Sequence, residues 1–380
     1  MYKLQVAANK LNIRNTPDAD PEYKNWVGEL LKGEEFLAES IVKGGLYNGI
    51  DLWYKDNYNR FATLSELGDN DPKIPWSLRI LGVPHVWNIT KGEGVKVAII
   101  DSGIDMKNPD LKSAVVSGFN ILTNTEYLLD QNDECLQSSF SHGNYCASIL
   151  ASRGNIGFFG VAPMCELVII KIANNRNDYN ISNEFLGIKK AIELGAEIIS
   201  LSFGGATQNF DISSLLQDAI QRGIICIASA GDFKNALNVE YPANLKGMIS
   251  IGNVTCLNPS ASLGQAIFNI SDKSNGQIPS SSNEGVTIVA PGEGITVYDL
   301  QQQVRQLVSG FGGTSWSVPY VSGIAAIWLS IIKRRNPSIN NHLNFRDFVI
   351  SNADKNFKDY NVKYWGNGLI NPISLIQINS

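Results

Sequence analysis

The chain has few of the residues that mark several common protein classes. No uninterrupted apolar run approaches about 20 residues, the length that a membrane-spanning helix needs, and the first residues lack the long apolar core of a signal peptide. The longest basic run is Lys333-Arg334-Arg335 and the net charge is −5, which argues against a nucleic-acid-binding protein. These absences predict a cytoplasmic protein that neither spans a membrane nor binds nucleic acid.

Cysteine and histidine are also scarce. The 5 cysteines form no CxxC pair, and several of them lie inside apolar runs, which favours buried, reduced thiols over a disulfide framework. Only 3 histidines are present (His85, His142 and His342), and the acidic residues do not cluster at metal-ligand spacing. The sequence therefore predicts no metal site and no required cofactor.

What is present is the composition of a globular protein, with 44% hydrophobic and 18% charged residues over 380 positions. Residues 1–67 form short strand-like runs separated by turn residues, which predicts a small all-β barrel. The polar residues 68–75 are typical of a linker. Over residues 76–376, buried strand-like runs alternate with helical patterns, which predicts a doubly wound, mostly parallel α/β sheet.

Polar residues follow three of these strand-like runs. Asp101 ends VKVAII, Ser202-Phe203-Gly204 follows EIISL, and Ala230-Gly231-Asp232 follows IICIAS. The carboxyl ends of parallel strands meet at one edge of the sheet, which is where ligands bind in such folds. We therefore expect these residues to lie together.

Three short motifs occur in a fixed order along the chain: DSGID with Asp101, SHGNYCAS with His142, and GGTSWSVPYVSG with Ser315. Each alone has an ordinary structural interpretation, as a turn aspartate, a structural histidine or a helix-capping serine. Together, with their flanking residues, they make the chain resemble the subtilisin-like serine proteases (subtilases) over roughly residues 75–376. The order Asp, His, Ser separates this family from the α/β-hydrolases.

The resemblance implies a subtilisin-like fold and a serine endopeptidase that cleaves peptide or protein substrates through an acyl-enzyme. Ser315 would be the nucleophile, and His142 would accept its proton. Asp101 would hold the imidazole in the correct tautomer and stabilise the imidazolium that forms.

Asp232 departs from the family pattern. Subtilases usually have an asparagine there, whose side chain donates a hydrogen bond to the oxyanion of the tetrahedral intermediate; an ionised carboxylate would repel that charge. Three alternatives stay open: Asp232 is protonated and donates, the Ser315 amide or a neighbouring group acts alone at a reduced rate, or the domain is a catalytically dead pseudoprotease that binds peptides or partners.

The resemblance also implies where a substrate would bind. Ser202, Phe203 and Gly204 would pair with the substrate backbone, and Ala230 and Gly231 would form the opposite wall of the primary specificity pocket. Glu240 would lie at the base of that pocket and favour Lys or Arg before the scissile bond. The alternative is that Glu240 is an exposed loop residue.

Two further expectations rest on the resemblance. Asp110 in NPDL matches a calcium ligand of the family, but the loop over residues 152–157 is one residue shorter than usual and contains Arg153, so calcium binding is left open. Residues 1–67 resemble a bacterial Src-homology-3-like domain through LNIRN, WVGELLKGEE and LWYKD. They stand where secreted subtilases carry a propeptide, so this domain is a candidate docking site for a regulatory partner.

Overall fold

The structure is a computed structural model. It describes residues 2–6, 10–14, 17, 26–31, 35–38, 40–47, 50–55, 61–63, 67–68, 73–126, 142–174, 179–232, 239–256, 268–270, 285–299, 303–307, 313–335, 341–356 and 360–379. The chain divides into two compact units, and each is described by itself. The first comprises Met1–Ile89, Cys256–Ile267 and Pro372–Ser380, and the second comprises Thr90–Thr255 and Phe268–Asn371.

The first unit contains antiparallel strands in two sheets, in the orders β3-β2-β7-β6-β5 and β4-β1-β8. The strands are β1 (Tyr2–Val6), β2 (Lys10–Arg14), β3 (Trp26–Leu31), β4 (Glu35–Ala38), β5 (Ser40–Tyr47), β6 (Ile50–Lys55), β7 (Phe61–Thr63) and β8 (Leu67–Gly68). The helices α1 (Trp76–Ile80), α2 (Val83–Val86) and α10 (Ser374–Asn379) also belong to this unit. Closure of the strands into a Src-homology-3-like barrel stays a prediction, and the predicted linker over 68–75 lies partly outside the described residues.

The second unit is built on a nine-stranded sheet in the order β11-β10-β12-β9-β13-β14-β15-β16, with β17 also paired to β15. Its strands are β9 (Lys96–Asp101), β10 (Val115–Asn120), β11 (Thr125–Glu126), β12 (Glu166–Lys171), β13 (Ile198–Leu201), β14 (Ile225–Ser229), β15 (Ile249–Cys256), β16 (Phe268–Ile270) and β17 (Ile288–Pro291). A separate antiparallel pair consists of β18 (Thr296–Tyr298) and β19 (Val304–Gln306). The pairs from β10 to β15, and β15 with β17, are parallel, whereas β11 is antiparallel to β10. The mostly parallel α/β sheet predicted from the sequence is confirmed.

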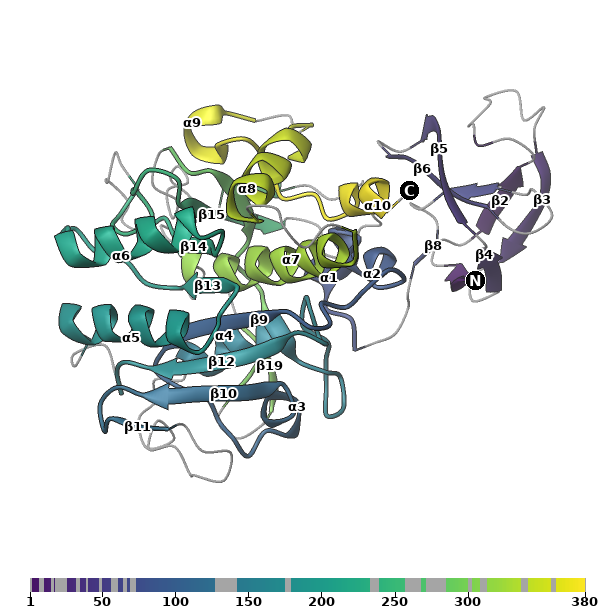
Figure 1. Cartoon of the computed structure of the whole chain (residues 1–380). Helices are drawn as coiled ribbons and strands as arrows, with labels where there is room; N and C mark the ends of the chain where they lie inside the picture. The colour runs from purple at the N-terminus through teal and green to yellow at the C-terminus, as the bar shows by residue number, and fades with distance from the viewer. Residues whose placement is uncertain are drawn as a thin grey trace. The chain divides into compact units, whose positions relative to one another are not determined.

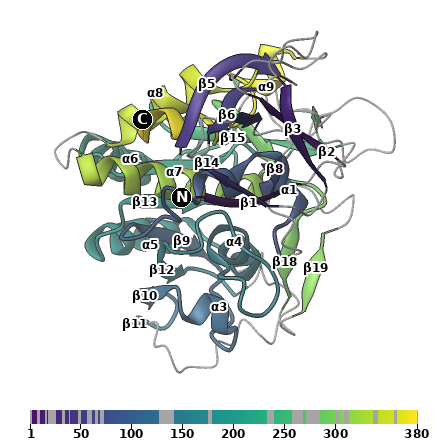
Figure 2. The same cartoon turned by 90° about the vertical axis from the view of Figure 1, so that its right-hand side faces the viewer.

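Helices cover both faces of this sheet. α5 and α6 pack side by side on one face, and α4 and α7 pack together on the other (Figures 1 and 2). The helices of this unit are α3 (Pro109–Lys112), α4 (His142–Ala151), α5 (Ile181–Glu193), α6 (Phe210–Gln221), α7 (Thr314–Arg335), α8 (Asn341–Asn352) and α9 (Val362–Trp365). Because both faces are covered, β13 and β14 are buried along their whole length, in keeping with their mostly apolar sequences.

Helix α7 is the longest helix of the described structure. By length and composition, residues Thr314–Arg334 would suffice to cross a membrane, with a mean hydropathy of 1.4. However, 89% of this stretch is buried inside the protein. The apolar character of α7 is therefore that of a core helix that packs against β13, β14 and β17.

The topology brings distant residues to one edge of the sheet. Asp101 is the last residue of β9, Ser202 follows β13, and Ala230 follows β14. Because β9, β13 and β14 are parallel neighbours, their carboxyl ends meet at the same edge. The expected clustering of these residues is therefore what the sheet order produces.

Candidate active site

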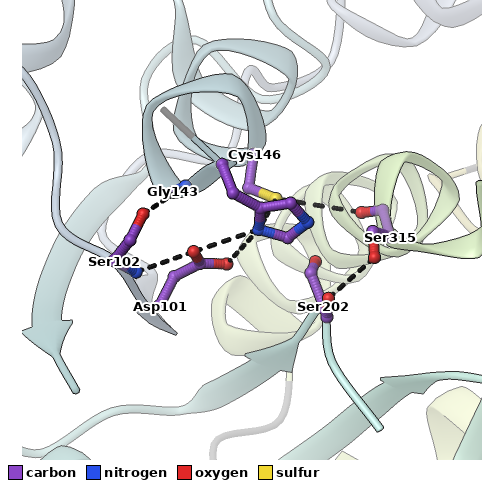
Figure 3. Close-up of polar contacts among 7 residues, drawn as sticks. Asp101, Ser102, Gly143, Cys146, Ser202 and Ser315 are labelled. Atoms are coloured by element: carbon purple, nitrogen blue, oxygen red, sulfur yellow. Dashed lines mark hydrogen bonds and ion pairs between the residues drawn. The ribbon is translucent and has the colours of Figure 1, made fainter. Parts of the chain in front are cut away.

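Asp101 and His142 form a close hydrogen-bonded pair at this edge. His142 Nδ1 lies 2.8 Å from Oδ2 and 3.0 Å from Oδ1 of Asp101, and Oδ1 also accepts a 2.7 Å hydrogen bond from the backbone N–H of Ser102 (Figure 3). A carboxylate can only accept, so Nδ1 must carry the proton in this pair. The Nε2 atom of the neutral ring is therefore left as the basic atom.

The surroundings of His142 also set its affinity for a proton. Burial lowers the pKa of His142, but the charge of Asp101 and its hydrogen bond more than offset this, so the pKa lies well above the usual 6.5. The ring lies against Trp316, with 4.7 Å between ring centroids. Because Trp316 follows Ser315 in α7, this contact joins the two helices that carry His142 and Ser315.

Ser315 lies in the first turn of α7, where backbone N–H groups have no acceptor within the helix. Its hydroxyl is 2.8 Å from the backbone carbonyl of Ser202 (Figure 3). A carbonyl can only accept, so the hydroxyl proton points at Ser202 in this conformation. Turning this proton toward another acceptor requires a rotation about the Cβ–Oγ bond of Ser315.

Cys146 is a member of this site that the sequence analysis treated only as a buried thiol. It lies one helical turn after His142 on α4, with Sγ 3.9 Å from His142 Nδ1 and 3.8 Å from the carbonyl of Ser315 (Figure 3). Burial raises the pKa of this thiol, so it is neutral at ordinary pH. The i, i+4 spacing after His142 is the signal that would have found it.

The described residues thus contain one group with the chemistry of a metal site, which the sequence did not predict. The ligand atoms of Asp101, His142 and Cys146 lie within 4.8 Å of one another. The Asp101–His142 hydrogen bond already uses two of these atoms. The other described cysteines, Cys165, Cys226 and Cys256, are not in disulfide bonds.

Asp232 lies against the start of α7. Its Oδ1 accepts a 2.8 Å hydrogen bond from the backbone N–H of Thr314. A Cβ atom on Gly313 would approach Asp232 Oδ2 to 2.8 Å, so the carboxylate occupies the space that a larger residue at 313 would need. The fold therefore places the Asp232 side chain beside the turn that carries Ser315.

The segments that follow β13 and β14, which the sequence predicts as pocket walls, are hydrogen-bonded to Tyr241 and Glu240, respectively. Gly205 and Tyr241 exchange backbone hydrogen bonds of 2.8 and 3.0 Å, and the Glu240 N–H donates to the Ala230 carbonyl at 2.9 Å. Glu240 is partly buried, and its Oε2 lies 3.1 Å from where a Cβ on Gly204 would be. Burial and the nearby charge of Asp232 raise the pKa of Glu240.

The surroundings of Asp110 do not fit a calcium ion. This carboxylate is fully buried. Its Oδ2 accepts from the hydroxyls of Ser152 and Tyr298, each at 3.1 Å, and its Oδ1 accepts from the Asn155 N–H at 3.0 Å. Calcium needs six to eight oxygen ligands, whereas the protons of three donors point at this carboxylate. An internal hydrogen-bond network holds Asp110 instead.

Comparisons with known proteins agree with this arrangement. The sequence profile of the Subtilase family matches residues 92–368. Intracellular serine protease of Paenibacillus polymyxa is 31% identical over 256 residues, which are 67% of this chain and 72% of that protein. Thermitase of Thermoactinomyces vulgaris is 28% identical over 296 residues, which are 77% of this chain and 92% of thermitase. Subtilisin E of Bacillus subtilis is 30% identical over 305 residues, which are 78% of this chain and 70% of subtilisin E.

A solved structure shows the same fold. It is that of fervidolysin from Fervidobacterium pennivorans, described as a keratinolytic enzyme related to subtilisin, with a TM-score of 0.66 and 21% identity. The match covers 80% of this chain but only 45% of the fervidolysin chain. With a profile match over most of its length and relatives at about 30% identity, the chain belongs to the Subtilase family of subtilisin-like serine peptidases.

Proposed function

We propose that the chain is a serine endopeptidase in which Ser315 attacks the carbonyl carbon of a peptide bond. The observation that carries the proposal is the 2.8 Å contact between Asp101 and His142, made at the edge of the sheet where Ser315 begins α7. This contact keeps the proton on Nδ1 of His142 and directs the basic Nε2 away from Asp101. His142 then takes the proton of Ser315 and later gives it to the leaving amine, and water releases the acyl group.

The negative oxygen of the tetrahedral intermediate needs hydrogen-bond donors. The Ser315 N–H supplies one, because it lies in the first turn of α7, where the positive end of the helix dipole also stabilises a negative charge. Asp232 adjoins the same turn. It serves the oxyanion only when a proton on the atom that faces the substrate turns it into a donor, so the enzyme works below the rate that an asparagine would allow.

A covalent probe tests whether Ser315 is an activated nucleophile. We expect a fluorophosphonate to label the wild-type chain, while the Ser315→Ala variant stays unlabelled under the same conditions. The phosphonylated peptide is located by mass spectrometry. Equal labelling of both chains, or labelling of neither, would support the rival function of a peptide-binding pseudoprotease.

The partly buried Glu240 supports a preference for a basic residue before the scissile bond. A carboxylate at the base of a pocket, with Asp232 nearby to add negative charge, binds the guanidinium of Arg or the ammonium of Lys. Because Gly204 has no side chain, the Glu240 side chain can lie beside its Cα. Ser202, Phe203, Ala230 and Gly231 complete the proposed pocket.

We expect Glu240→Gln to lower the ratio of kcat/KM for Arg over Leu at this substrate position by about 10–100-fold, since a charge-assisted contact is lost. Paired fluorogenic peptides that differ only at this residue measure the ratio. Glu193→Gln, at an exposed glutamate of α5, is the matched control and should leave the ratio unchanged. A wild-type preference for Phe or Leu over Arg would refute the assignment.

The relatives also bear on location and organisation. Two of them are named intracellular serine protease and major intracellular serine protease, which supports a cytoplasmic location.

We propose the peptidase domain over residues 76–376, after a Src-homology-3-like barrel over 1–67 and a linker over 68–75. The strands of the first unit support the barrel as a docking site for a regulatory partner.

A further inference from the structure

The first turn of α4 lies very close to the segment that follows Asp101. A Cβ atom on Gly143 would lie 2.4 Å from the backbone carbonyl oxygen of Gly103 and 3.1 Å from the Cβ atom of Asp101, so position 143 accepts only glycine at this separation. The Gly143 N–H, which has no acceptor within the helix, donates a 3.1 Å hydrogen bond to the Ser102 hydroxyl oxygen (Figure 3). The approach of α4 to this segment sets the distance between His142 and Asp101.

Asn144 makes a second contact between α4 and this segment. Its side chain is fully buried, and the amide oxygen Oδ1 accepts a 3.1 Å hydrogen bond from the Asp105 N–H. The amide nitrogen Nδ2 donates a 2.8 Å hydrogen bond to the carbonyl of Tyr298, in β18. Because a backbone N–H can only donate and a backbone carbonyl can only accept, these two partners fix the orientation of the amide. The side chain of Asn144 therefore bridges α4, the segment after Asp101 and β18.

Tyr298 gives this bridge a firm anchor. Its backbone N–H donates a 3.3 Å hydrogen bond to the hydroxyl oxygen of Ser148, one helical turn after Asn144 on α4, so both backbone polar groups of Tyr298 bind to α4. Its hydroxyl donates to Asp110 and accepts from the Phe158 N–H, at 3.1 and 3.3 Å, and the whole residue is buried. The amide of Asn144 therefore cannot shift without the loss of a buried hydrogen bond, which is costly.

The hydrogen bond between His142 and Asp101 depends on the same separation. The atoms Nδ1 and Oδ2 are 2.8 Å apart, and a charge-assisted bond of this kind weakens as the distance grows. Against the lowering effect of burial, Asp101 holds the pKa of His142 well above 6.5. A contact that fixes the segment after Asp101 against α4 therefore also fixes how strongly Asp101 acts on the ring.

We propose that Asn144 is a positioning residue, which holds Asp101 at hydrogen-bond distance from His142 by tying the segment after Asp101 to α4. The contact of Oδ1 with Asp105 does the positioning, and the contact of Nδ2 with Tyr298 keeps Oδ1 turned toward Asp105. The inference rests on the proposed function, because it explains how the base of that reaction is oriented. The alternative is that Asn144 only satisfies two buried backbone groups and contributes to stability.

Histidine NMR on the Ser315→Ala chain tests the positioning role without relying on catalysis. The chain has only 3 histidines. Burial lowers the pKa of His85 to about 4 and lowers that of His342 below its usual value. Isotope-labelled histidine therefore reports His142 as the residue that takes up a proton at the highest pH, and its Nδ1–H proton gives a separate signal that moves downfield as the bond to a carboxylate shortens.

We expect Asn144→Ala to lower the pKa of His142 toward 6.5 and to move its Nδ1–H resonance upfield, since the bond to Asp101 lengthens. In the chain with Ser315 intact, the same substitution should lower kcat by about 10–100-fold and change KM little, because a displaced base affects the reaction rather than binding. Ser148→Ala is the matched control on the same helix. It removes a contact to β18 but leaves the segment after Asp101 bound, so it should keep the pKa and the resonance.

Asn144→Asp keeps the assignment testable even where the alanine variant does not fold. An aspartate has the same shape and offers the Asp105 N–H an acceptor whichever way it turns, and an added carboxylate can only raise the pKa of a nearby histidine. This variant should therefore keep the pKa of His142 at or above the parent value and keep the downfield resonance. An unchanged pKa and resonance in Asn144→Ala, or a lowered pKa in Asn144→Asp, would overturn the positioning role. Failure of the proposed function shows separately, as absence of fluorophosphonate labelling of the wild-type chain.

Discussion

Replacing Ser315 with alanine is expected to lower kcat for peptide hydrolysis by about 10⁶-fold, because the only proposed nucleophile is lost. KM should change little, since the proposed pocket residues around Glu240 are untouched. Purified variant and wild type are compared on one fluorogenic peptide under single-turnover conditions. A residual rate about 10³–10⁴-fold above the uncatalysed reaction should remain, because substrate binding and the oxyanion donors persist.

His142→Ala provides the matched comparison for Ser315→Ala. The two residues act as a unit, so each single variant should lose a similar amount of activity and the double variant should lose almost no more. Additive losses would show that His142 and Ser315 act independently, contrary to the proposed mechanism. A loss of less than about tenfold for Ser315→Ala would remove this serine from the chemistry altogether.

Asp232→Asn is expected to raise kcat, by up to about 10²–10³-fold, because it restores a donor to the oxyanion. The substitution is isosteric. The Asn Oδ1 can keep the 2.8 Å hydrogen bond from the Thr314 N–H, while the amide nitrogen takes the place of Oδ2 beside Gly313. Measurement of kcat across pH 5–9 on one peptide gives the gain at each pH.

The pH dependence of that gain separates the alternatives for Asp232. If wild type works through a protonated Asp232, its activity falls as pH rises and the proton is lost, whereas an asparagine donates at every pH. The gain should therefore grow with pH. Asp232→Ala supplies neither acceptor nor donor, so it is the control and should not show a gain in kcat. Lower activity of Asp232→Asn at every pH would contradict the donor assignment, and an unchanged kcat would place Asp232 outside the oxyanion site.

The parts of the site that could be predicted share one property, which is that local sequence patterns encode them. Asp101 ends an apolar strand, and His142 and Ser315 begin apolar helices within Gly- and Ser-rich motifs. A parallel sheet brings such chain segments to one edge whatever the lengths of the loops between them. This is why the sheet type and the clustering of the candidate residues could be predicted from the sequence.

Pairs of side chains from distant segments could not be predicted in the same way. The sequence left calcium open at Asp110, because the loop over residues 152–157 is short and contains Arg153. The partners Ser152 and Tyr298 are remote from Asp110 in the chain, so only packing shows that their hydroxyls satisfy the carboxylate. No sequence motif distinguishes Glu184 from the other glutamates of the chain. Its burial and its unpaired oxygen follow from the placement of Tyr179, which precedes α5.

By itself, the sequence determined the family, the alternation of strands and helices, and the identity of the three residues proposed for catalysis, because each of these depends on contiguous motifs or periodic patterns. Only the tertiary structure decided which proton His142 holds, that Cys146 adjoins it, that the Asp232 carboxylate is bonded to the start of α7, and that Asp110 is satisfied internally. Hydrogen-bond direction, burial and electrostatic environment depend on distances of a few ångströms between segments remote in sequence, and such distances exist only once the sheet and its covering helices have packed.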